Sequence, residues 1–260
     1  MLTFGMPTLI EAPSAQESAA LCRSLGLHFV ELNMNLPQYQ LDVVDAAHLR
    51  RIADENGIFY TIHLDENTNV CDFNPYVAQA YLRTVRETIA LAGEIGAPVV
   101  NMHLPCGVYF TLPHRRVYLF EEYRERYLAR MAELRAVCGE AAAKAGVMIC
   151  IENTDGFAGF QQEALDGLLD SPGFALTYDV GHDHACGGVD AAYISGKADC
   201  LHHMHLHDAL GRQNHLPLGT GEIDLNACLR LADVHNCRVV LETKTAEGLR
   251  QSVRWLKCNG

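Results

Sequence analysis

The chain has 260 residues, 49% of them hydrophobic, and a formal net charge of −12 at pH 7. This length supports one large core but would be cramped for two unrelated domains, so we expect a single domain over residues 1–260. The acidic balance repels phosphate backbones and argues against a nucleic-acid partner. No segment approaches the roughly 20 consecutive apolar residues of a membrane span, and the first residues lack a basic stretch followed by an apolar run. We therefore expect a cytoplasmic protein that does not enter a membrane.

The predicted elements alternate along the chain between short strand-like runs and longer helical segments, as in parallel strands joined by helices. Eight strands are predicted, at Leu2–Met6, Phe29–Asn33, Phe59–Leu64, Val99–Leu104, Met148–Glu152, Ala175–Asp179, His203–His207 and Val239–Glu242. Helices are predicted at Ser14–Leu25, Val43–Asn56, Tyr76–Ile95 and Glu121–Ala145, and they end at Gly26, Gly57, Gly96 and Gly146. The segment Cys106–Val117 is a long connection, either a lid or a plain surface loop.

Eight such pairs fit a closed (β/α)₈ TIM barrel of the α/β class or an open doubly wound sheet. A doubly wound sheet usually has fewer strands and often carries a glycine-rich phosphate-binding turn after its first strand. No G-x-G-x-x-G sequence follows the first predicted strand. The pattern therefore favours the barrel.

The ten cysteines are spread singly between Cys22 and Cys258, without a C-x-x-C pair. Chains stabilised by a disulfide framework are usually much shorter than this one. We therefore expect reduced thiols, most of them buried.

Potential metal ligands or acid–base groups stand at the ends of six predicted strands: His63, His103, Glu152, Asp179, His205 and Glu242. The C-terminal strand ends of a barrel converge on one mouth, where active sites are built. Each residue alone could be an ordinary core histidine or strand-end carboxylate. Several carboxylates in one mouth, however, would repel one another unless a cation or protons neutralised them. The mixed nitrogen and oxygen donors fit zinc or manganese best, with magnesium and cobalt left open.

Two further histidine-rich segments lie near these strand ends. His182 follows Asp179 by three residues and could be a ligand, a proton donor or a substrate contact. In the strand His203–His207 alternate side chains share a face, so His203, His205 and His207 point one way. We expect His202, His203 and His207 to be structural or to orient ligands, with Asp208 as a candidate to hold such a histidine.

The segment from His215 to Asp224 contains two glycines, Gly219 and Gly221, next to the site. Glycine is favoured where backbone turns tightly or approaches a ligand closely. The alternative is an ordinary turn that caps the helix near Asp224.

In order and combination, these motifs resemble the superfamily that contains sugar (phosphate) isomerases and epimerases, endonuclease IV and the xylose isomerase-like barrels. The resemblance spans almost the whole chain. It is carried by Thr61-Ile-His63, Asn101-Met-His103, Ile151-Glu152-Asn153-Thr154, Asp179-Val-Gly-His182, Met204-His205-Leu-His207-Asp208, His215 through Ile223, and Leu241-Glu242-Thr243.

The two branches of this superfamily imply different metal sites. The epimerase branch implies one divalent ion held by Glu152, Asp179, His205 and Glu242. The endonuclease branch implies three zinc ions that also use His63, His103, His182 and an Asp-x-His pair, which falls here on Gln213-Asn-His215. A neutral amide is a poor zinc ligand, so Gln213 argues against the full cluster. A second ion held by His63 and His103 with Glu152 bridging stays open, as does an incomplete site at His182 and His215.

The resemblance leads us to expect a metal-dependent sugar or sugar-phosphate isomerase or epimerase of carbohydrate metabolism. Glu152 and Glu242 would move a proton through an enediolate, with His182 binding a substrate oxygen or assisting. The alternatives are a zinc-dependent phosphodiester hydrolase, a dehydratase acting on a cyclic polyol, and a sugar-binding barrel without catalysis. His114, Arg115 and Arg116 could bind a substrate phosphate or face water, and the oligomeric state stays open.

Overall fold

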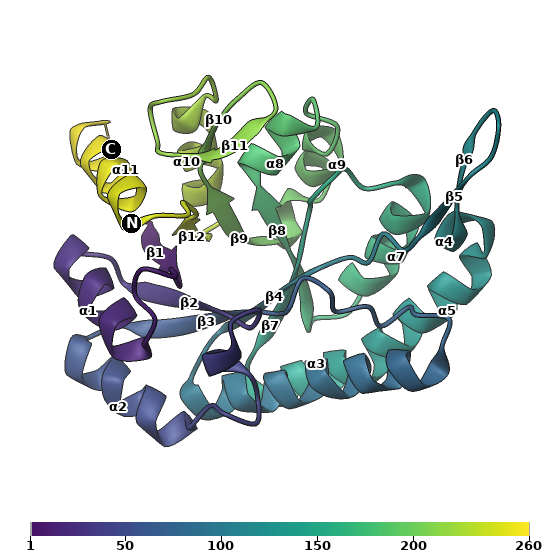
Figure 1. Ribbon diagram of the computed structural model, residues 1–260, viewed down its shortest axis with the longest axis horizontal. Coiled ribbons are helices and arrows are strands. Elements are labelled where there is room, and N and C mark those ends of the chain that lie inside the picture. The colour runs from purple at the N-terminus through teal and green to yellow at the C-terminus, as the bar shows by residue number, and fades with distance from the viewer. Residues whose placement is uncertain (1, 260) are drawn as a thin grey trace.

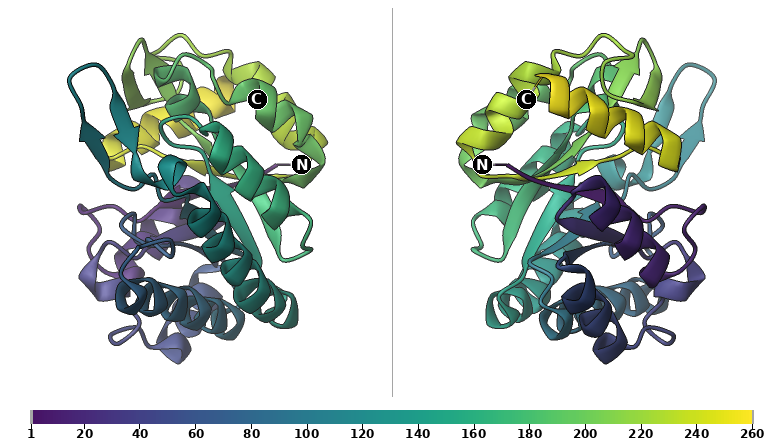
Figure 2. Two further views of the ribbon diagram at one scale, coloured as in Figure 1. Left: turned by 90° about the vertical axis from the view of Figure 1, so that its right-hand side faces the viewer. Right: turned by 90° about the vertical axis from the view of Figure 1, so that its left-hand side faces the viewer.

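The computed structural model describes residues 2–259, and its centre is a closed barrel of eight parallel strands (Figure 1). In order around the barrel these are β1 (Thr3–Pro7), β2 (Phe29–Asn33), β3 (Phe59–His63), β4 (Val99–His103), β7 (Met148–Glu152), β8 (Phe174–Asp179), β9 (Leu201–Leu206) and β12 (Arg238–Leu241). The first and last of them pair and close the barrel (Figure 2). The predicted barrel and its eight strands are confirmed, with bounds shifted by one or two residues at several ends.

Helices surround the barrel and follow the strands in sequence. They are α1 (Ala15–Leu25), α2 (Ala46–Asn56), α3 (Pro75–Ile95), α4 (Leu119–Glu122), α5 (Arg124–Leu134), α6 (Glu140–Ala145), α7 (Gly159–Leu169), α8 (Val180–Ala185), α9 (Ala191–Gly196), α10 (Leu225–Val234) and α11 (Ala246–Asn259), with 3₁₀ turns at Pro37–Tyr39 and Ala198–Cys200. The four predicted glycine stops are confirmed, because Gly26, Gly57, Gly96 and Gly146 follow helices in the left-handed conformation that glycine adopts without strain. None of the described helices is long and apolar enough to cross a membrane.

The single helix predicted at Glu121–Ala145 is wrong, because this stretch is divided. Tyr123 leaves helical geometry between α4 and α5, and a π-helical turn (Arg135–Gly139) separates α5 from α6. The turn contains Gly139, whose backbone lies so close to the loop before β8 that a Cβ added at Gly173 would be 2.7 Å from the Gly139 oxygen. Helical periodicity continues through such a turn, so the sequence pattern alone does not reveal it.

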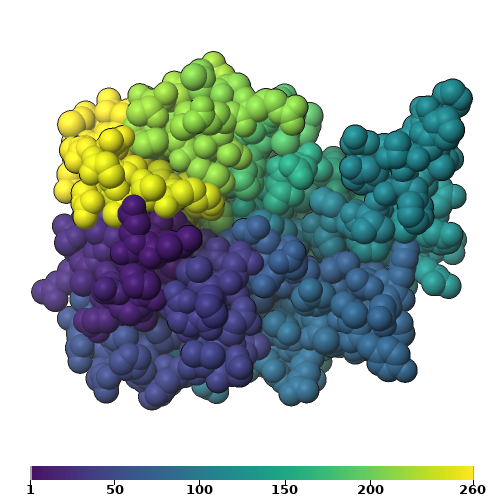
Figure 3. Space-filling view, viewed as in Figure 1, coloured from purple at the N-terminus to yellow at the C-terminus, as the bar shows by residue number. Residues whose placement is uncertain are grey.

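The segment Cys106–Val117 contains most of an antiparallel hairpin, β5 (Tyr109–Thr111) and β6 (Arg116–Tyr118), where no strand was predicted. The hairpin projects away from the body of the molecule (Figures 1 and 3). His114, Arg115 and Arg116 are exposed on it, and the Arg116 guanidinium lies 4.8 Å from the centre of the Tyr109 ring. A second short hairpin, β10 (Asp208–Leu210) and β11 (Gln213–Leu216), follows β9.

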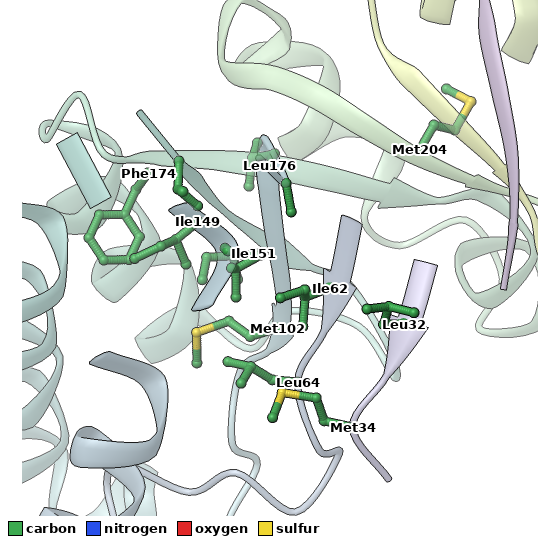
Figure 4. Close-up of a cluster of buried hydrophobic side chains, with 14 of the residues drawn as sticks. Leu32, Met34, Ile62, Leu64, Met102, Ile149, Ile151, Phe174, Leu176 and Met204 are labelled. Carbon is green, nitrogen blue, oxygen red and sulfur yellow. The ribbon is translucent and has the colours of Figure 1, made fainter. Parts of the chain in front are cut away.

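Successive side chains along each strand point alternately to the outside and the inside of the barrel, and this divides the core into two parts. One set of side chains, including Leu32, Ile62, Met102 and Ile151, packs in the main apolar cluster with the helices (Figure 4). Each such side chain contributes about 1.5–3 kcal/mol when fully buried. The other set faces the barrel axis and begins with a small separate cluster of Val99, Cys150 and Ala175.

Farther along the same inward faces the buried side chains become polar: Glu31, Thr61, Asn101, Thr177 and His203. The interior is therefore apolar near the N-terminal strand ends and polar near the C-terminal ends. All ten cysteines are free thiols, as expected. The expectation that most of them are buried is wrong, because only five are: Cys22, Cys71, Cys138, Cys150 and Cys237.

Candidate metal centre

Four strands that are neighbours in the barrel bring Glu152, Asp179, His205 and Glu242 together. Glu152 ends β7, Asp179 ends β8, His205 lies in β9, and Glu242 directly follows β12. His205 Nδ1 is 3.2 Å from Glu152 Oε1, 3.3 Å from Glu242 Oε2 and 3.8 Å from Asp179 Oδ2. One atom from each residue lies within 4.8 Å of all the others.

These distances fit a single divalent ion. Metal–ligand bonds of about 2.0–2.2 Å in tetrahedral geometry separate the ligand atoms by about 3.3–3.6 Å. Glu242 Oε2 is also buried without a hydrogen-bond partner among the described residues, as are His103 Nε2, His182 Nδ1 and His215 Nδ1. Buried polar atoms usually have partners, so these atoms fit a site completed by a cation or by a ligand with polar groups.

The electrostatics of the cluster also fit a bound cation. Burial is the largest single influence and raises the pKa of the Glu152 and Glu242 carboxyls. Their neighbours together outweigh it and hold both pKa values well below the ordinary range: His205 and His103 at Glu152, and His205, Lys244 and His215 at Glu242. Burial lowers the pKa of His205, whereas Glu152, Glu31 and Glu242 raise it well above its ordinary value. A proton on His205 thus neutralises the carboxylates, and a bound metal would displace the proton on the ligating nitrogen.

His63 and His103 lie beside Glu152, on the side away from Asp179. His63 Nε2 is 3.1 Å and His103 Nε2 is 3.3 Å from Glu152 Oε2, to which the Asn101 amide also donates a hydrogen bond. Burial lowers the pKa of His63, but the contact with Glu152 raises it to about 9. The two histidines can therefore fix Glu152 or share it with a second ion.

His182 and His215 lie on the other side of the cluster, around Asp179 and Glu242. Asp179 Oδ1 accepts the backbone N–H of His182 at 2.7 Å and so caps α8. The two histidine Nε2 atoms are 3.4 Å apart, and His215 Nδ1 is 3.9 Å from Glu242 Oε2. Burial lowers the pKa of His215 to about 4. Gln213 is exposed on β11.

His207 has the orienting position expected for it. Its Nδ1 accepts the backbone N–H of His215 at 2.8 Å, so its Nε2 carries the proton and donates to Asp179 Oδ2 at 3.2 Å. A Cβ added at Gly181 would lie 1.9 Å from this ring, which explains the glycine in the first turn of α8. His202, on the opposite face of β9, is only partly buried and lies outside the cluster.

The expectation that Asp208 holds a histidine is wrong, because its oxygens accept backbone N–H groups. Gly219 and Gly221 donate to Oδ2 at 2.9 and 2.8 Å, and Ile223 donates to Oδ1 at 3.2 Å. Asp208 thus organises the loop beside the site. The helix cap at Asp224 is confirmed as well, since its side chain accepts the N–H of Ala227.

We expect Gly221→Ala to destabilise the protein by about 2 kcal/mol or more, because the new Cβ would lie 2.2 Å from the Ala209 oxygen and 2.4 Å from Asp208 Oδ1. Gly167→Ala is the matched control. Nothing lies within 4 Å of a Cβ there, inside α7, so alanine should stabilise by about 0.5–1 kcal/mol. Urea unfolding of both variants measures the difference, and equal effects would contradict this account of the loop.

A pocket of about 620 Å³ opens over the cluster and is lined by Glu152, His63, His103, His182, His215 and Glu242 among others. Its rim adds the acidic side chains Glu66 and Asp155. Within the described part of the chain, Lys244 is the one lysine or arginine in this lining, with its Nζ 2.9 Å from Glu242 Oε1. The lining does not include His114, Arg115 or Arg116, so the lid that would have carried them to a phosphate is not formed.

Glu31, Asn153 and Lys244 were not among the candidates from the sequence. Asn153 exchanges two hydrogen bonds of 2.9 Å with the Asp179 backbone and so fixes the end of β8. Glu31 lies within β2 rather than at its end. The sequence feature that could have identified it is a charged residue between apolar residues of a predicted strand. Lys244 is exposed and follows a strand end closely, but a lone lysine there is not distinctive.

Comparison with known proteins shows which family the chain belongs to. Solved structures with the same fold include a D-tagatose 3-epimerase-like protein (TM-score 0.81, 22% identity, covering 98% of this chain and 96% of that one) and a 3-keto-D-glucoside 4-epimerase from E. coli (0.78, 14%, 99% and 100%). A probable 3-DHS dehydratase from Bacillus anthracis is similar too (0.76, 13%, 100% and 100%). A comparison with curated protein sequences finds no significant match. The family model described as xylose isomerase-like TIM barrel matches residues 19–258, and the chain belongs to that family.

Proposed function

We propose that this protein is a metal-dependent epimerase or isomerase of an unphosphorylated sugar. The observation that carries the proposal is the position of two carboxylates in one pocket. Glu152 and Glu242 come from β7 and from the end of β12, which are separated in the barrel by β8 and β9. Asp179 and His205 come from the two strands between them. A substrate held over this centre would lie between two acid–base groups.

Glu152, Asp179, His205 and Glu242 would hold the ion, which when bound would polarise a substrate carbonyl and make the adjacent C–H more acidic. One glutamate would take that proton and the other would return it to the same or the neighbouring carbon. Glu242 is the more accessible of the two, at 14% side-chain exposure against 1% for Glu152. His182 lines the pocket, its Nδ1 has no hydrogen-bond partner among the described residues, and it would bind a substrate oxygen.

The charges around the pocket favour a neutral substrate. Glu66 and Asp155 add negative charge at the rim, and Lys244 is already paired with Glu242. A phosphate group would meet mainly carboxylates there, and such contacts are repulsive. The same charges, with Gln213 at the position of a zinc-binding aspartate, weigh against phosphodiester hydrolysis. The epimerases among the structures with this fold support a sugar as substrate.

The test begins with metal content per chain, measured by plasma mass spectrometry on protein purified without added metal or chelator. The protein is then incubated with neutral ketoses and aldoses and their phosphates in D₂O, and deuterium uptake is followed by NMR. We expect about one manganese or zinc ion per chain and uptake at carbon next to the carbonyl of a neutral sugar. Two or three zinc ions with nicking of abasic DNA would favour the hydrolase, and loss of water without exchange into substrate would favour a dehydratase. Metal binding without any reaction would leave a sugar-binding barrel.

A further inference from the structure

Glu31 is a buried carboxylate beneath the proposed metal centre. It lies in the middle of β2, points into the barrel and is 2% exposed. His205 Nε2 is 2.8 Å from Oε1, His203 Nε2 is 2.9 Å from Oε2, and Thr61 Oγ1 donates to Oε2 at 3.0 Å. A carboxylate is costly to bury without polar partners. The three contacts of Glu31 offset this cost and allow a charged group to lie inside the barrel.

The contact with Glu31 distinguishes the two nitrogens of His205. Nε2 faces Glu31, whereas Nδ1 faces Glu152, Glu242 and Asp179. With a metal ion bound at Nδ1, the remaining ring proton would be on Nε2, which lies beside Glu31 Oε1. The lone pair of Nδ1 then points at the metal position.

We propose that Glu31 is a positioning residue for the metal centre, which holds His205 in the Nε2–H tautomer with Nδ1 as the metal ligand. His203 supports it from two residues earlier on the same face of β9, by donating to the other oxygen of Glu31. Carboxylates that accept the free N–H of a ligating histidine fix its orientation and make it a stronger ligand. The proposal rests on the metal site of the proposed function but not on the reaction.

Glu31, His203 and His205 also have ligand atoms close enough to one another to suggest an ion of their own. The short distances argue against such an ion. Separations of 2.8 and 2.9 Å between nitrogen and oxygen are those of direct charge-assisted contacts, whereas ligands on a tetrahedral ion are about 3.3–3.6 Å apart. The His203 contact is a hydrogen bond, while His205 Nε2 lies against Glu31 as an ion pair and has no hydrogen-bond partner among the described residues. An ion there would also have to displace the hydrogen bond from Thr61.

The test compares Glu31→Gln with the wild-type protein by competition of Zn²⁺ and Mn²⁺ with a chromophoric chelator. We expect the dissociation constant to rise about 10- to 100-fold, and the visible spectrum of the Co²⁺-loaded variant to change in shape. In the zinc-loaded wild type, ¹H–¹⁵N NMR of the histidine rings should show a proton on Nε2 of His205. Glutamine has the size of glutamate but can donate as well as accept, so that tautomer should no longer be uniform.

His203→Gln and His202→Gln form a matched pair on opposite faces of β9. The former should weaken metal binding by a smaller factor than Glu31→Gln, and the latter should leave it unchanged. If Glu31→Gln does not fold, as judged by circular dichroism, Thr61→Val removes one hydrogen bond to Glu31 and should raise the dissociation constant in the same direction. Unchanged affinity and Co²⁺ spectrum in all of the folded variants would overturn the proposal.

A zinc-loaded wild type with its His205 proton on Nδ1 would overturn it directly. A wild-type protein that binds no divalent ion would overturn both the metal site and the role of Glu31. Metal binding of the expected kind without sugar proton exchange would contradict the proposed reaction alone.

Discussion

Glu242→Gln is expected to lower sugar epimerisation or isomerisation by about 100- to 10,000-fold, the range lost when a positioned acid–base group is removed. Glutamine keeps an oxygen that can contact a metal but cannot take or return a proton. Glu242 lines the pocket, and its Oε2 has no hydrogen-bond partner among the described residues, whereas its Oε1 is paired with Lys244. Turnover, deuterium exchange and metal content of the variant give the result.

Glu152→Gln should lower turnover to a similar extent, with a larger effect on metal binding. Both oxygens of Glu152 are surrounded, by His63, His103 and Asn101 on one side and His205 on the other. Glu87→Gln is the control, because Glu87 is an exposed residue of α3 paired with Arg83 and should leave turnover unchanged. Unchanged turnover in either site variant, with metal bound, would exclude that glutamate as an acid–base group.

The sequence was sufficient to predict the fold and the convergence of the four candidate ligands, for one physical reason. In a parallel barrel all strands end at the same mouth, so residues at successive strand ends must meet there. Glu152 and Asp179 are the last residues of β7 and β8 in the structure, which leaves little freedom in where their side chains lie. Shifts of one or two residues in strand bounds did not affect this result.

Features that depend on contacts between distant segments could not be predicted in this way. Glu31 is within a strand, and its value to the site depends on His203 and His205, which are far away in sequence. Asp208 follows a run of histidines, but its partners are backbone groups of a loop, which no pattern of side chains reveals. The hairpin β5–β6 lacks the two-residue turn with glycine or asparagine that usually marks a hairpin.

Removal of the metal is expected to abolish activity and to destabilise the protein. An ion at a thousand times its dissociation constant stabilises the folded state by about 4 kcal/mol. The metal also balances charge at the site. Glu152, Asp179 and Glu242 lie together, and in the metal-free protein they are balanced mainly by protonated histidines, with Lys244 at Glu242. Thermal unfolding with EDTA, and again after Mn²⁺ or Zn²⁺ is restored, measures the loss and its recovery.

The destabilisation should grow from pH 6 to pH 9. The pKa of His63 is raised to about 9 in the folded protein, chiefly by Glu152 acting against burial. A raised pKa contributes stability that is fully present below the unfolded value near 6.5 and is lost as the pH rises through about 9. Metal binding also strengthens with pH, because ligands must lose their protons. Both effects widen the gap in Tm between metal-loaded and metal-free protein, and a gap that is constant or shrinks over this range would contradict the view that histidine protons take the place of the ion.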